Sequence, residues 1–303
     1  MLANIHDWLR EPLPRLVFEI SEAGVTLARL GSKSRLPEDL VFRPLAAGAV
    51  ESSPVKENIH DPDEVDRALD QALKQAGNGR KKQKDVALLL PDNCARIAVL
   101  DFENLPGDGA ERASLIRWRL KKAVPFDVET AAISYQVQKP SRDREGASGK
   151  QLSVLVAVSP AEVIRQYEAA IRRLGLVPGY VSISVTAALN LLTEHGVTML
   201  AKLAGRTLSL VVVNEGQVRL VRTLEAGLDP EAVAADLYPT FVYVADNFGA
   251  PVSRLALAGF GASLAQAMDV FRRELGCETA PLQGPQGPVD AHNAGIWGFL
   301  SGS

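Results

Sequence analysis

The sequence predicts an α/β protein with two similar lobes around a cleft and a smaller α/β unit inserted into the first lobe. Two observations lead to this prediction. Three strand-like segments followed by a helix occur early in the chain and again late, which indicates an internal repeat. Between the two sets, residues 86–175 run strand, strand, helix, strand, strand, helix, as a compact unit of their own. A length of 303 residues is sufficient for this arrangement.

The composition is that of an ordinary globular protein, with 47% hydrophobic and 23% charged residues. A net charge of −3 gives no general attraction to nucleic acid or anionic lipid. Cys94 and Cys277 stand far apart without a CxxC motif, so we expect buried thiols in a reducing compartment. The four histidines lack metal-ligand spacing. Because no signal peptide and no window of roughly 18 apolar residues is present, we expect a cytoplasmic protein without a direct membrane span.

The first lobe is expected to begin with an antiparallel meander of three strands, at residues 16–20, 25–30 and 40–45. A helix should follow. Asp61, Pro62 and Glu64 provide an N-cap, a first-turn proline and a capping-box partner, and Gly77 provides a stop. Two further strands are expected at residues 86–90 and 97–102.

A capped helix and a strand are expected within residues 108–137. Asp108 precedes Glu111 at the capping-box spacing, and apolar residues then recur every three or four positions up to Ala123. Pro125 should stop the helix, because the residue before a proline is pushed out of the α region. A half-buried strand should follow, with alternating residues on one face: Ile133, Tyr135 and Val137.

The rest of the chain provides the second set of strands and helices. Residues 140–150 are polar and should form an exposed loop, before a strand at 152–158 and a capped helix at 160–175. Later strands are expected at 199–203, 208–213, 218–224 and 255–258, with a hairpin turn at 214–217. Helices should begin at Asp229, Leu264 and shortly before Ile296, and Pro239 should kink or restart the first of these.

One segment resembles a known family. Residues 116–129 read IRW-x-x-x-x-x-VPFD-x-E, and the strand after them reads SYQV. This run is similar to the signature of PilM, the cytoplasmic actin-like component of the type IV pilus assembly platform. The resemblance implies an actin-like (ribonuclease H-like) two-lobed fold with an inserted 1C-type subdomain. The implied limits are 1–85 with 176–190 and 289–303 for the first lobe, 86–175 for the inserted subdomain and 191–288 for the second lobe.

The resemblance also implies a partner. Proteins of this family bind the cytoplasmic tail of a PilN-like bitopic membrane protein, in a groove between the main lobe and the inserted subdomain, and are thereby held at the inner membrane. Aromatic and arginine side chains carry most of the energy of peptide binding. We therefore expect six residues to line or shape the groove: Arg117, Trp118, Lys121, Pro125, Phe126 and Tyr135. For Phe126 and Tyr135, ordinary packing is an equally good interpretation.

The family resemblance further implies a nucleotide site, which this chain has altered. Relatives hold ATP and Mg²⁺ on turns that combine an aspartate with a glycine. In the first such turn this chain has Glu19 and Ser21, and in the second it has Lys202, with Gly205 three positions later. A later loop keeps two glycines that could admit a nucleobase, Gly259 and Gly261.

The charge at position 202 decides our expectation for the cofactor. An ammonium in place of a carboxylate near Mg²⁺ turns attraction into repulsion, worth about 4 kcal/mol for unit charges 4 Å apart at an effective dielectric of 20. We expect no cofactor and no ATPase activity. Binding of ATP with Mg²⁺ stays the alternative, since Lys202 could contact a phosphate directly.

Three alternative functions stay open from the sequence. The first is an active actin-like ATPase or nucleotide switch. The second is the cytoplasmic domain of a GspL-like type II secretion protein, which is normally followed by a membrane span that we do not find before Ser303. The third is a filament-forming protein of the cell-division type. A homo-oligomer is possible, whereas a nucleic-acid partner is not expected because only Trp118 interrupts the basic residues of the helix at 108–123.

Overall fold

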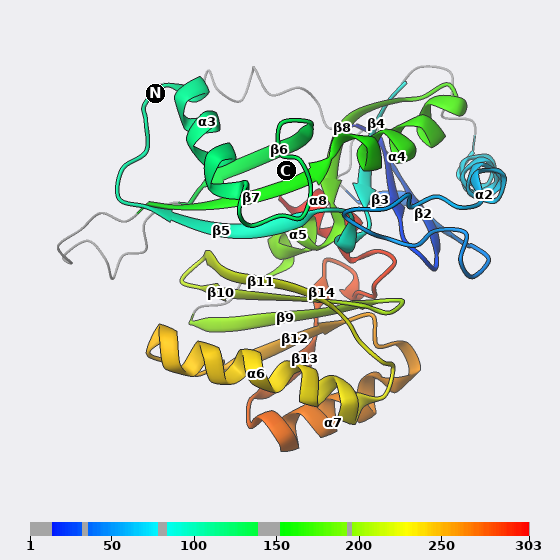
Figure 1. The fold of residues 1–303 in the computed structure, drawn as a ribbon. Coiled ribbons are helices and arrows are strands. Elements are labelled where there is room, and N and C mark those ends of the chain that lie inside the picture. Colours follow the sequence, from blue (N-terminus) through cyan, green and yellow to red (C-terminus); the bar gives the residue numbers. More distant parts are fainter. Residues whose placement is uncertain (1–13, 32–35, 78–83, 139–151, 193–195, 303) are drawn as a thin grey trace, which may run out of the picture.

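The computed structural model describes residues 14–31, 36–77, 84–138, 152–192 and 196–302. In these residues three larger β-sheets and one two-stranded hairpin have helices around and between them (Figure 1). The polar segment expected as a loop at 140–150 lies outside these residues. Two five-stranded sheets form the two lobes, and a three-stranded sheet forms a smaller unit beside the first lobe.

The first lobe is built on a sheet of order β3-β2-β1-β4-β8. Its strands are β1 (Leu16–Ile20), β2 (Gly24–Leu30), β3 (Pro37–Pro44), β4 (Asp85–Leu90) and β8 (Val177–Ile183). The first three form the expected antiparallel meander, and β4 and β8 are parallel to β1. Two helices pack together on this sheet, α2 (Pro62–Gln75) and α4 (Ala161–Arg173). The side chain of Asp61 accepts the N–H of Glu64 at 2.9 Å, so the predicted N-cap of α2 is confirmed.

The second lobe is built on a sheet of order β11-β10-β9-β12-β13. Its strands are β9 (Val197–Ala204), β10 (Thr207–Asn214), β11 (Gln217–Glu225), β12 (Arg254–Ala258) and β13 (Glu278–Pro281). Helices α6 (Pro230–Phe248) and α7 (Leu264–Leu275), with the short 3-10 turn η5 (Gly261–Ser263), cover the outer face (Figure 1). The predicted hairpin turn is confirmed: Glu215 and Gly216 have φ of +50° and +74°, the left-handed pair that a two-residue turn requires.

The helices that join the lobes lie between the two large sheets (Figure 1). They are α5 (Ser184–Ala188), followed by the 3-10 turn η4 (Leu189–Leu191), and α8 (Ala294–Ser301) from the far end of the chain. A small hairpin, β14 (Gln283–Gly284) and β15 (Gly287–Pro288), precedes α8. Gly298 allows α8 to approach α5 closely, because a Cβ at this position would lie 2.1 Å from the carbonyl oxygen of Ala187.

The smaller unit is a sheet of order β5-β7-β6 covered on one face by α3 (Gly109–Leu120). Its strands are β5 (Arg96–Phe102), β6 (Ala131–Val137) and β7 (Leu152–Pro160), and the 3-10 turn η2 (Asp92–Cys94) leads into it from β4. In β7, Val154, Val156 and Val158 pack under α3, whereas Leu155 on the other face packs toward the first lobe. Asp108 accepts the N–H groups of Ala110 and Glu111, as the capping pattern predicts.

The expected limits of the inserted unit, 86–175, are too wide. β4 lies inside the first sheet, between β1 and β8, and α4 packs on the first-lobe core. Both segments are apolar enough to belong to either unit, and only strand pairing and packing assign them. We propose limits of about 95–160 for this unit.

Two expectations for helix ends also need correction. The helix that begins at Asp108 ends at Leu120, before Pro125 could stop it. In the second lobe α6 runs through Pro239 from Pro230 to Phe248 without a restart. Pro239 lies on the exposed side of α6, where water can satisfy the carbonyl that loses its hydrogen bond to the missing N–H.

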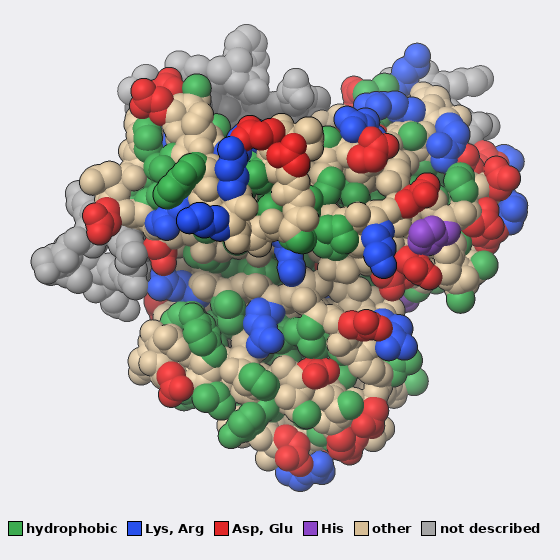
Figure 2. All heavy atoms as spheres, viewed as in Figure 1, with side chains coloured by type: hydrophobic (Ala, Val, Ile, Leu, Met, Phe, Trp, Pro, Cys, Tyr) green, Lys and Arg blue, Asp and Glu red, His purple; other side chains and the backbone are tan. Residues whose placement is uncertain are grey.

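The surface carries charges of both signs. On the face shown in Figure 2, basic and acidic side chains are interspersed rather than gathered by sign. Hydrophobic side chains are prominent over the second lobe in this view, where α6 crosses the front (Figure 2). The well-exposed large hydrophobic residues of α6 and of the segment just before it are Leu228, Tyr238, Val242 and Tyr243.

Candidate functional site: a closed cleft and an open groove

Lys202 lies on the face of β9 that points at the first lobe. Successive side chains of a strand point to opposite faces, and in β9 Met199, Ala201 and Leu203 pack into the core with α6 and α7. Lys202 therefore shares the other face with Leu200, which packs into the first-lobe core. Its Nζ lies 2.9 Å from Oδ2 of Asp92, and both side chains are at most 2% exposed. A water-excluded ion pair thus joins the two lobes.

Asp92 accepts hydrogen bonds from both lobes. Its Oδ2 accepts from Lys202 and, at 2.9 Å, from the hydroxyl of Ser209, which stands opposite Lys202 in the β9–β10 ladder. Its Oδ1 accepts the N–H of Val185 in the first turn of α5 at 2.8 Å. The carboxylate is therefore fully engaged, with one helix N–H satisfied in addition to the ion pair.

Glu19 adds a second buried carboxylate to the cleft. Its Oε2 accepts the N–H of Ile296 in the first turn of α8 at 3.0 Å, and its Oε1 accepts the hydroxyl of Ser184. Asn293, at the N-cap of α8, makes no side-chain capping bond, so Glu19 from a distant strand satisfies part of that helix end. Burial raises the pKa of Glu19 above its ordinary value near 4.5, and the nearby charge of Lys202 opposes this rise.

The β1–β2 turn that carries Ser21 is closed on itself. The N–H of Ser21 donates to the carbonyl of Gly24 at 2.9 Å, and its hydroxyl donates to the same oxygen at 3.0 Å. The N–H of Gly24 donates back to the Ser21 hydroxyl at 3.2 Å. These N–H groups are engaged within the turn rather than directed at a phosphate.

Gly205 lies in the turn of the second lobe that faces the first. Its φ of +61° is left-handed, as the β9–β10 turn requires. A Cβ at this position would lie 2.8 Å from Oε2 of Glu22, so the two turns approach each other closely across the cleft. The other oxygen of Glu22, Oε1, accepts the N–H and the hydroxyl of Ser52 at 3.0 and 2.5 Å.

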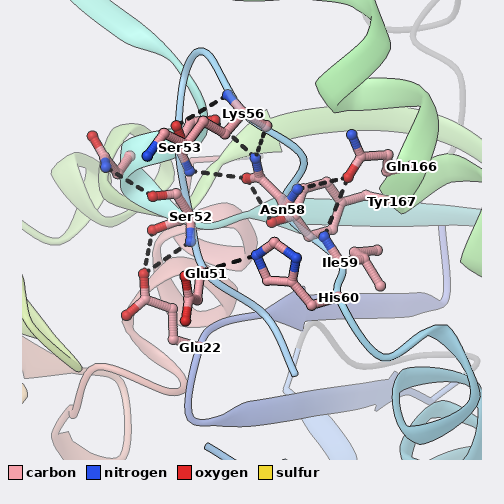
Figure 3. A network of polar contacts seen from close by, with 11 residues as sticks. Glu22, Glu51, Ser52, Ser53, Lys56, Asn58, Ile59, His60, Gln166 and Tyr167 are labelled. Carbon is pink, nitrogen blue, oxygen red and sulfur yellow. Dashed lines mark hydrogen bonds and ion pairs between the residues drawn. The ribbon is translucent and has the colours of Figure 1, made fainter. Parts of the chain in front are cut away.

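Ser52 belongs to the loop between β3 and α2, which a polar network holds against the cleft (Figure 3). Asn58 is fully buried and is the centre of this network: its Oδ1 accepts from Ser53 N–H and from the hydroxyl of Tyr167 at 3.1 and 3.0 Å. Gln166 of α4 accepts the N–H groups of Asn58 and Ile59. The loop is thereby fixed to α4, with Ser52 at the wall of the cleft.

The two glycines of the later loop have different surroundings. Gly259, with φ of +88°, packs so closely that a Cβ would lie 1.8 Å from the carbonyl oxygen of Leu203 and 2.7 Å from Cβ of Ala291. Gly261 has no atom within 4 Å of such a Cβ. Gly259 therefore serves close packing against β9 and the segment before α8, and Gly261 alone borders open space.

A small cavity of about 10 Å³ lies in the cleft, and this volume is close to the minimum that holds one water molecule. Glu19, Ser21, Asp92 and Lys202 are among its lining residues. Within the described ranges, no group of three or more His, Cys, Asp or Glu side chains is placed to hold a metal ion. The structure thus brings together the predicted residues Glu19, Ser21 and Lys202 at the wall of one small cavity between the lobes.

An open groove of about 1820 Å³ lies between the three-stranded unit and the two lobes. One wall is β6 with the facing side of β7, and the opposite wall is formed by β8, α5, η4 and Phe299 of α8. The β10–β11 turn, with Glu215 and Gln217, forms one end. Apolar side chains such as Leu155 and Leu189 line much of the groove, as is common for ligand sites.

Only one of the six predicted groove residues, Tyr135, lines this groove. The other five lie on α3 or just after it, and α3 covers the opposite face of the three-stranded sheet. Trp118 is 62% exposed there, and Lys121 forms an ion pair of 2.7 Å with Glu129. The guanidinium of Arg117 donates to the carbonyl of Val128, Pro125 is exposed, and Phe126 packs against the core under α3.

Sequence reasoning missed Asp92, the partner of Lys202. The available signal was an acid placed directly after an apolar strand and a proline, in the run Leu90-Pro91-Asp92. Such a position is at the end of a buried strand, where an unpaired carboxylate would be costly. Ser209 and Ser184 gave no comparable signal, because single serines within apolar runs are common.

Comparisons with known proteins establish the fold. No family model and no curated protein matches the sequence. The structure is similar to a chain of the PilM-PilN type IV pilus biogenesis complex, with a TM-score of 0.76 over 95% of this chain and 98% of that chain at 18% identity. It is also similar, with a TM-score of 0.52 and 12% identity over 94% and 95% of the two chains, to a Bacteroides thetaiotaomicron protein with an actin-like ATPase fold and unknown function.

A third similar structure is the cytoplasmic domain of EpsL, an inner membrane component of the Vibrio cholerae type II secretion system, with a TM-score of 0.49 and 13% identity over 80% of each chain. The two stronger matches confirm the expected fold class. The chain has the actin-like α/β fold, and its two lobes meet at the cleft described above.

Replacing Lys202 by methionine is expected to lower the free energy of unfolding by about 3–5 kcal/mol, because Asp92 is left as an uncompensated buried charge. Adding Asp92→Asn should recover much of this loss, since a neutral pair no longer has a charge to compensate. Urea unfolding measures the free energy of unfolding of the single and the double variant. Arg272→Met, which removes an exposed ion pair with Asp269, serves as control and should change stability by less than about 1 kcal/mol. A Lys202→Met loss no larger than the control would contradict the proposed role of the pair.

The raised pKa of Glu19 predicts a pH dependence of stability. The unfolded chain ionises this carboxyl near pH 4.5, whereas the folded chain keeps its proton to a higher pH. Wild-type stability relative to Glu19→Gln should therefore fall as the pH rises from 4.5 through the folded-state pKa, by at most about 1.4 kcal/mol per pH unit. Unfolding curves of both proteins between pH 4 and 8 measure this difference. A difference that grows with pH would show that the folded-state pKa is lowered instead.

Proposed function

We propose that this actin-like chain is a cytoplasmic adaptor of a type IV pilus inner-membrane platform. In this proposal it binds the cytoplasmic tail of a PilN-like bitopic membrane protein and does not hydrolyse ATP. The observation that carries the proposal is the contrast between two spaces in one fold. The cavity found in the cleft between the lobes has a volume of about 10 Å³, while the groove beside the three-stranded unit has about 1820 Å³.

The likeness to a chain of the PilM-PilN complex supports this choice of partner class, because it extends over 95% of this chain. The similarity therefore includes the three-stranded unit as well as the lobes. A groove that both units border can accept a peptide without any rearrangement of the cleft.

The closed cleft supports an adaptor rather than an ATPase or nucleotide switch. Hydrolysis would require a metal and positioned phosphates. Here the position of a metal-binding acid is held by Lys202, whose charge is neutralised by Asp92. Opening the cleft for a nucleotide would break this pair and uncover two buried carboxylates.

Within the described ranges, no helix is long and apolar enough to cross a membrane. The proposal places the chain at the inner membrane through its partner. A homo-oligomer within the platform is compatible with this arrangement, and the exposed apolar residues of α6 offer one surface for it.

The direct test is titration of the protein with a synthetic peptide of the cytoplasmic tail of the PilN-like protein from the same organism, followed by calorimetry. We expect saturable binding whose affinity is unchanged by 1:1 or excess Mg²⁺-ATP, and no heat from ATP alone. Absence of tail binding would contradict the adaptor proposal, and magnesium-dependent ATP binding would contradict the closed cleft.

A groove variant and a matched control locate the tail. Ser134 is exposed on the groove side of β6, so Ser134→Arg should obstruct the groove and weaken tail binding at least tenfold. Trp118→Ala removes a large side chain from the opposite face of the same unit and should change affinity less than twofold. The reverse pattern would place the tail on α3, where five of the six residues predicted from the sequence lie.

A further inference from the structure

β6 is an edge strand whose free side faces the groove. The sheet order is β5-β7-β6, so only one side of β6 is paired. All residues from Ala132 to Gln138 line the groove. Alternate side chains point to opposite faces of a sheet, so seven consecutive lining residues mean that the edge of β6, rather than one face, borders the space.

The backbone groups on that edge can be assigned from the register. The N–H of Gln138 donates to the carbonyl of Ser153 at 2.8 Å, so residue 138 directs its backbone groups toward β7. Hydrogen-bonded pairs alternate along an antiparallel ladder, and residues 136, 134 and 132 therefore do the same. Ile133, Tyr135 and Val137 direct their N–H and C=O groups away from β7, toward the groove. Pro160, which has no N–H, stands opposite Ala131, as this alternation allows.

These outward groups have no strand partner in the part of the chain that the structure describes, where β6 pairs with β7 alone. An unpaired edge without charges is a liability that folded proteins usually block with charges, prolines or a covering segment. None of residues 132–138 is charged or proline. An edge kept free beside a groove of this size has the properties of a template for a further strand.

At the end of the groove near β11, the side chain of Gln138 makes the hydrogen bonds that a neighbouring strand would make. The Nε2 of Gln138 donates to the carbonyl of Val218 at 2.9 Å, and its Oε1 accepts the N–H of Val218 at 2.7 Å. The amide of Gln138 thus pairs with the backbone at the start of β11 and closes this end. The free edge extends from there along Val137, Tyr135 and Ile133.

We propose that the occupant of the groove is an extended peptide that adds a strand to the free edge of β6. This inference rests on the proposed function, because the peptide is taken to be the tail of the membrane partner. The three outward residues span about 13 Å at 3.4 Å per residue, so a segment of five or six residues is sufficient. One set of its alternating side chains would face the apolar wall that includes Leu189 and Phe299.

The charges at the groove favour a basic tail. Among the described lining residues the only charged side chains are acidic, Glu168 and Glu215. Glu168 is already paired with Arg172 at 3.0 Å. Glu215 is exposed at the β10–β11 turn, where its Oε1 accepts the N–H of Gly196 at 3.2 Å. Cytoplasmic segments next to a membrane span are enriched in Lys and Arg. A tail with an apolar core and a flanking lysine or arginine therefore complements the groove, with Glu215 as its charged contact.

N-methylation of the tail peptide tests strand addition directly, because it removes one backbone N–H and leaves every side chain in place. Peptides of the proposed tail are made with a single N-methyl group at each successive position, and their affinities are measured by calorimetry. We expect at least tenfold weaker binding at alternate positions within a segment of five or six residues, and less than twofold change at the positions between them.

The outcomes separate this inference from the function on which it rests. If the unmodified tail does not bind, the adaptor proposal fails. If it binds and N-methylation has no alternating effect, strand addition is wrong while the adaptor proposal stands. If binding is lost at consecutive positions, the peptide is not bound as a strand, and the inference is again overturned.

Two substitutions of Val137 provide the matching test in the protein. Val137→Pro removes an N–H that points into the groove without removing a bond to β7, and an edge strand tolerates proline there. It should weaken tail binding at least tenfold, whereas Val137→Ala should change it less than threefold. Thermal unfolding of both variants confirms that they are folded. Equal affinities for the two Val137 variants would contradict strand addition.

The charged contact is tested separately. Glu215→Gln should weaken binding two- to fivefold at low salt and have no effect at 0.5 M NaCl, where charges are screened.

Discussion

The ion pair between Lys202 and Asp92 is the interaction on which the arrangement of the lobes depends. It joins a strand of the second sheet to the turn after a strand of the first, with both side chains shielded from water. Taking two charges out of water is costly, and their attraction offsets the cost only when the remaining hydrogen-bonding groups are satisfied. Here Ser209 and the N–H of Val185 complete the partners of Asp92. The pair therefore favours one relative position of the lobes strongly over others.

Glu19 extends this constraint to the C-terminal helix. It accepts an N–H of α8 and lies within the field of Lys202, so one charge cluster involves both lobes, the joining helix α5 and the end of the chain. Glu19, Asp92 and Lys202 all line the small cavity between the lobes.

A closed cleft leaves the groove as the space that can respond to a partner. The groove is bordered by the three-stranded unit on one side and by both lobes on the other, so a bound peptide would contact all three parts of the molecule. The face of the small sheet that α3 covers is a separate surface, with Trp118 exposed on it.

Local sequence patterns were sufficient to predict most of the strands and helices, the repeated pattern of the two lobes and the unusual charge at position 202. These features depend on local rules: alternation in strands, capping at Asp61 and Asp108, and turn residues such as Gly216. The family resemblance, rather than a local rule, predicted that Glu19, Ser21 and Lys202 lie near one another. Local patterns could not assign β4 and α4 to the first lobe, because an apolar strand or helix does not specify its neighbours.

The partner of Lys202 and the place of the groove depend on contacts between segments that are far apart in the sequence. The partner of Lys202 is 110 residues earlier in the chain, and an acid after a strand does not show which base it will meet. The groove residues belong to segments as distant as β6 and α8, and the sequence signature at 116–126 lies on the opposite face of the small sheet. Conspicuous aromatic and basic residues were the strongest signal in the sequence. The groove is bordered by the backbone edge of β6. Residue types do not show which strand lies at the edge of a sheet, so this edge could be identified only from strand order and register.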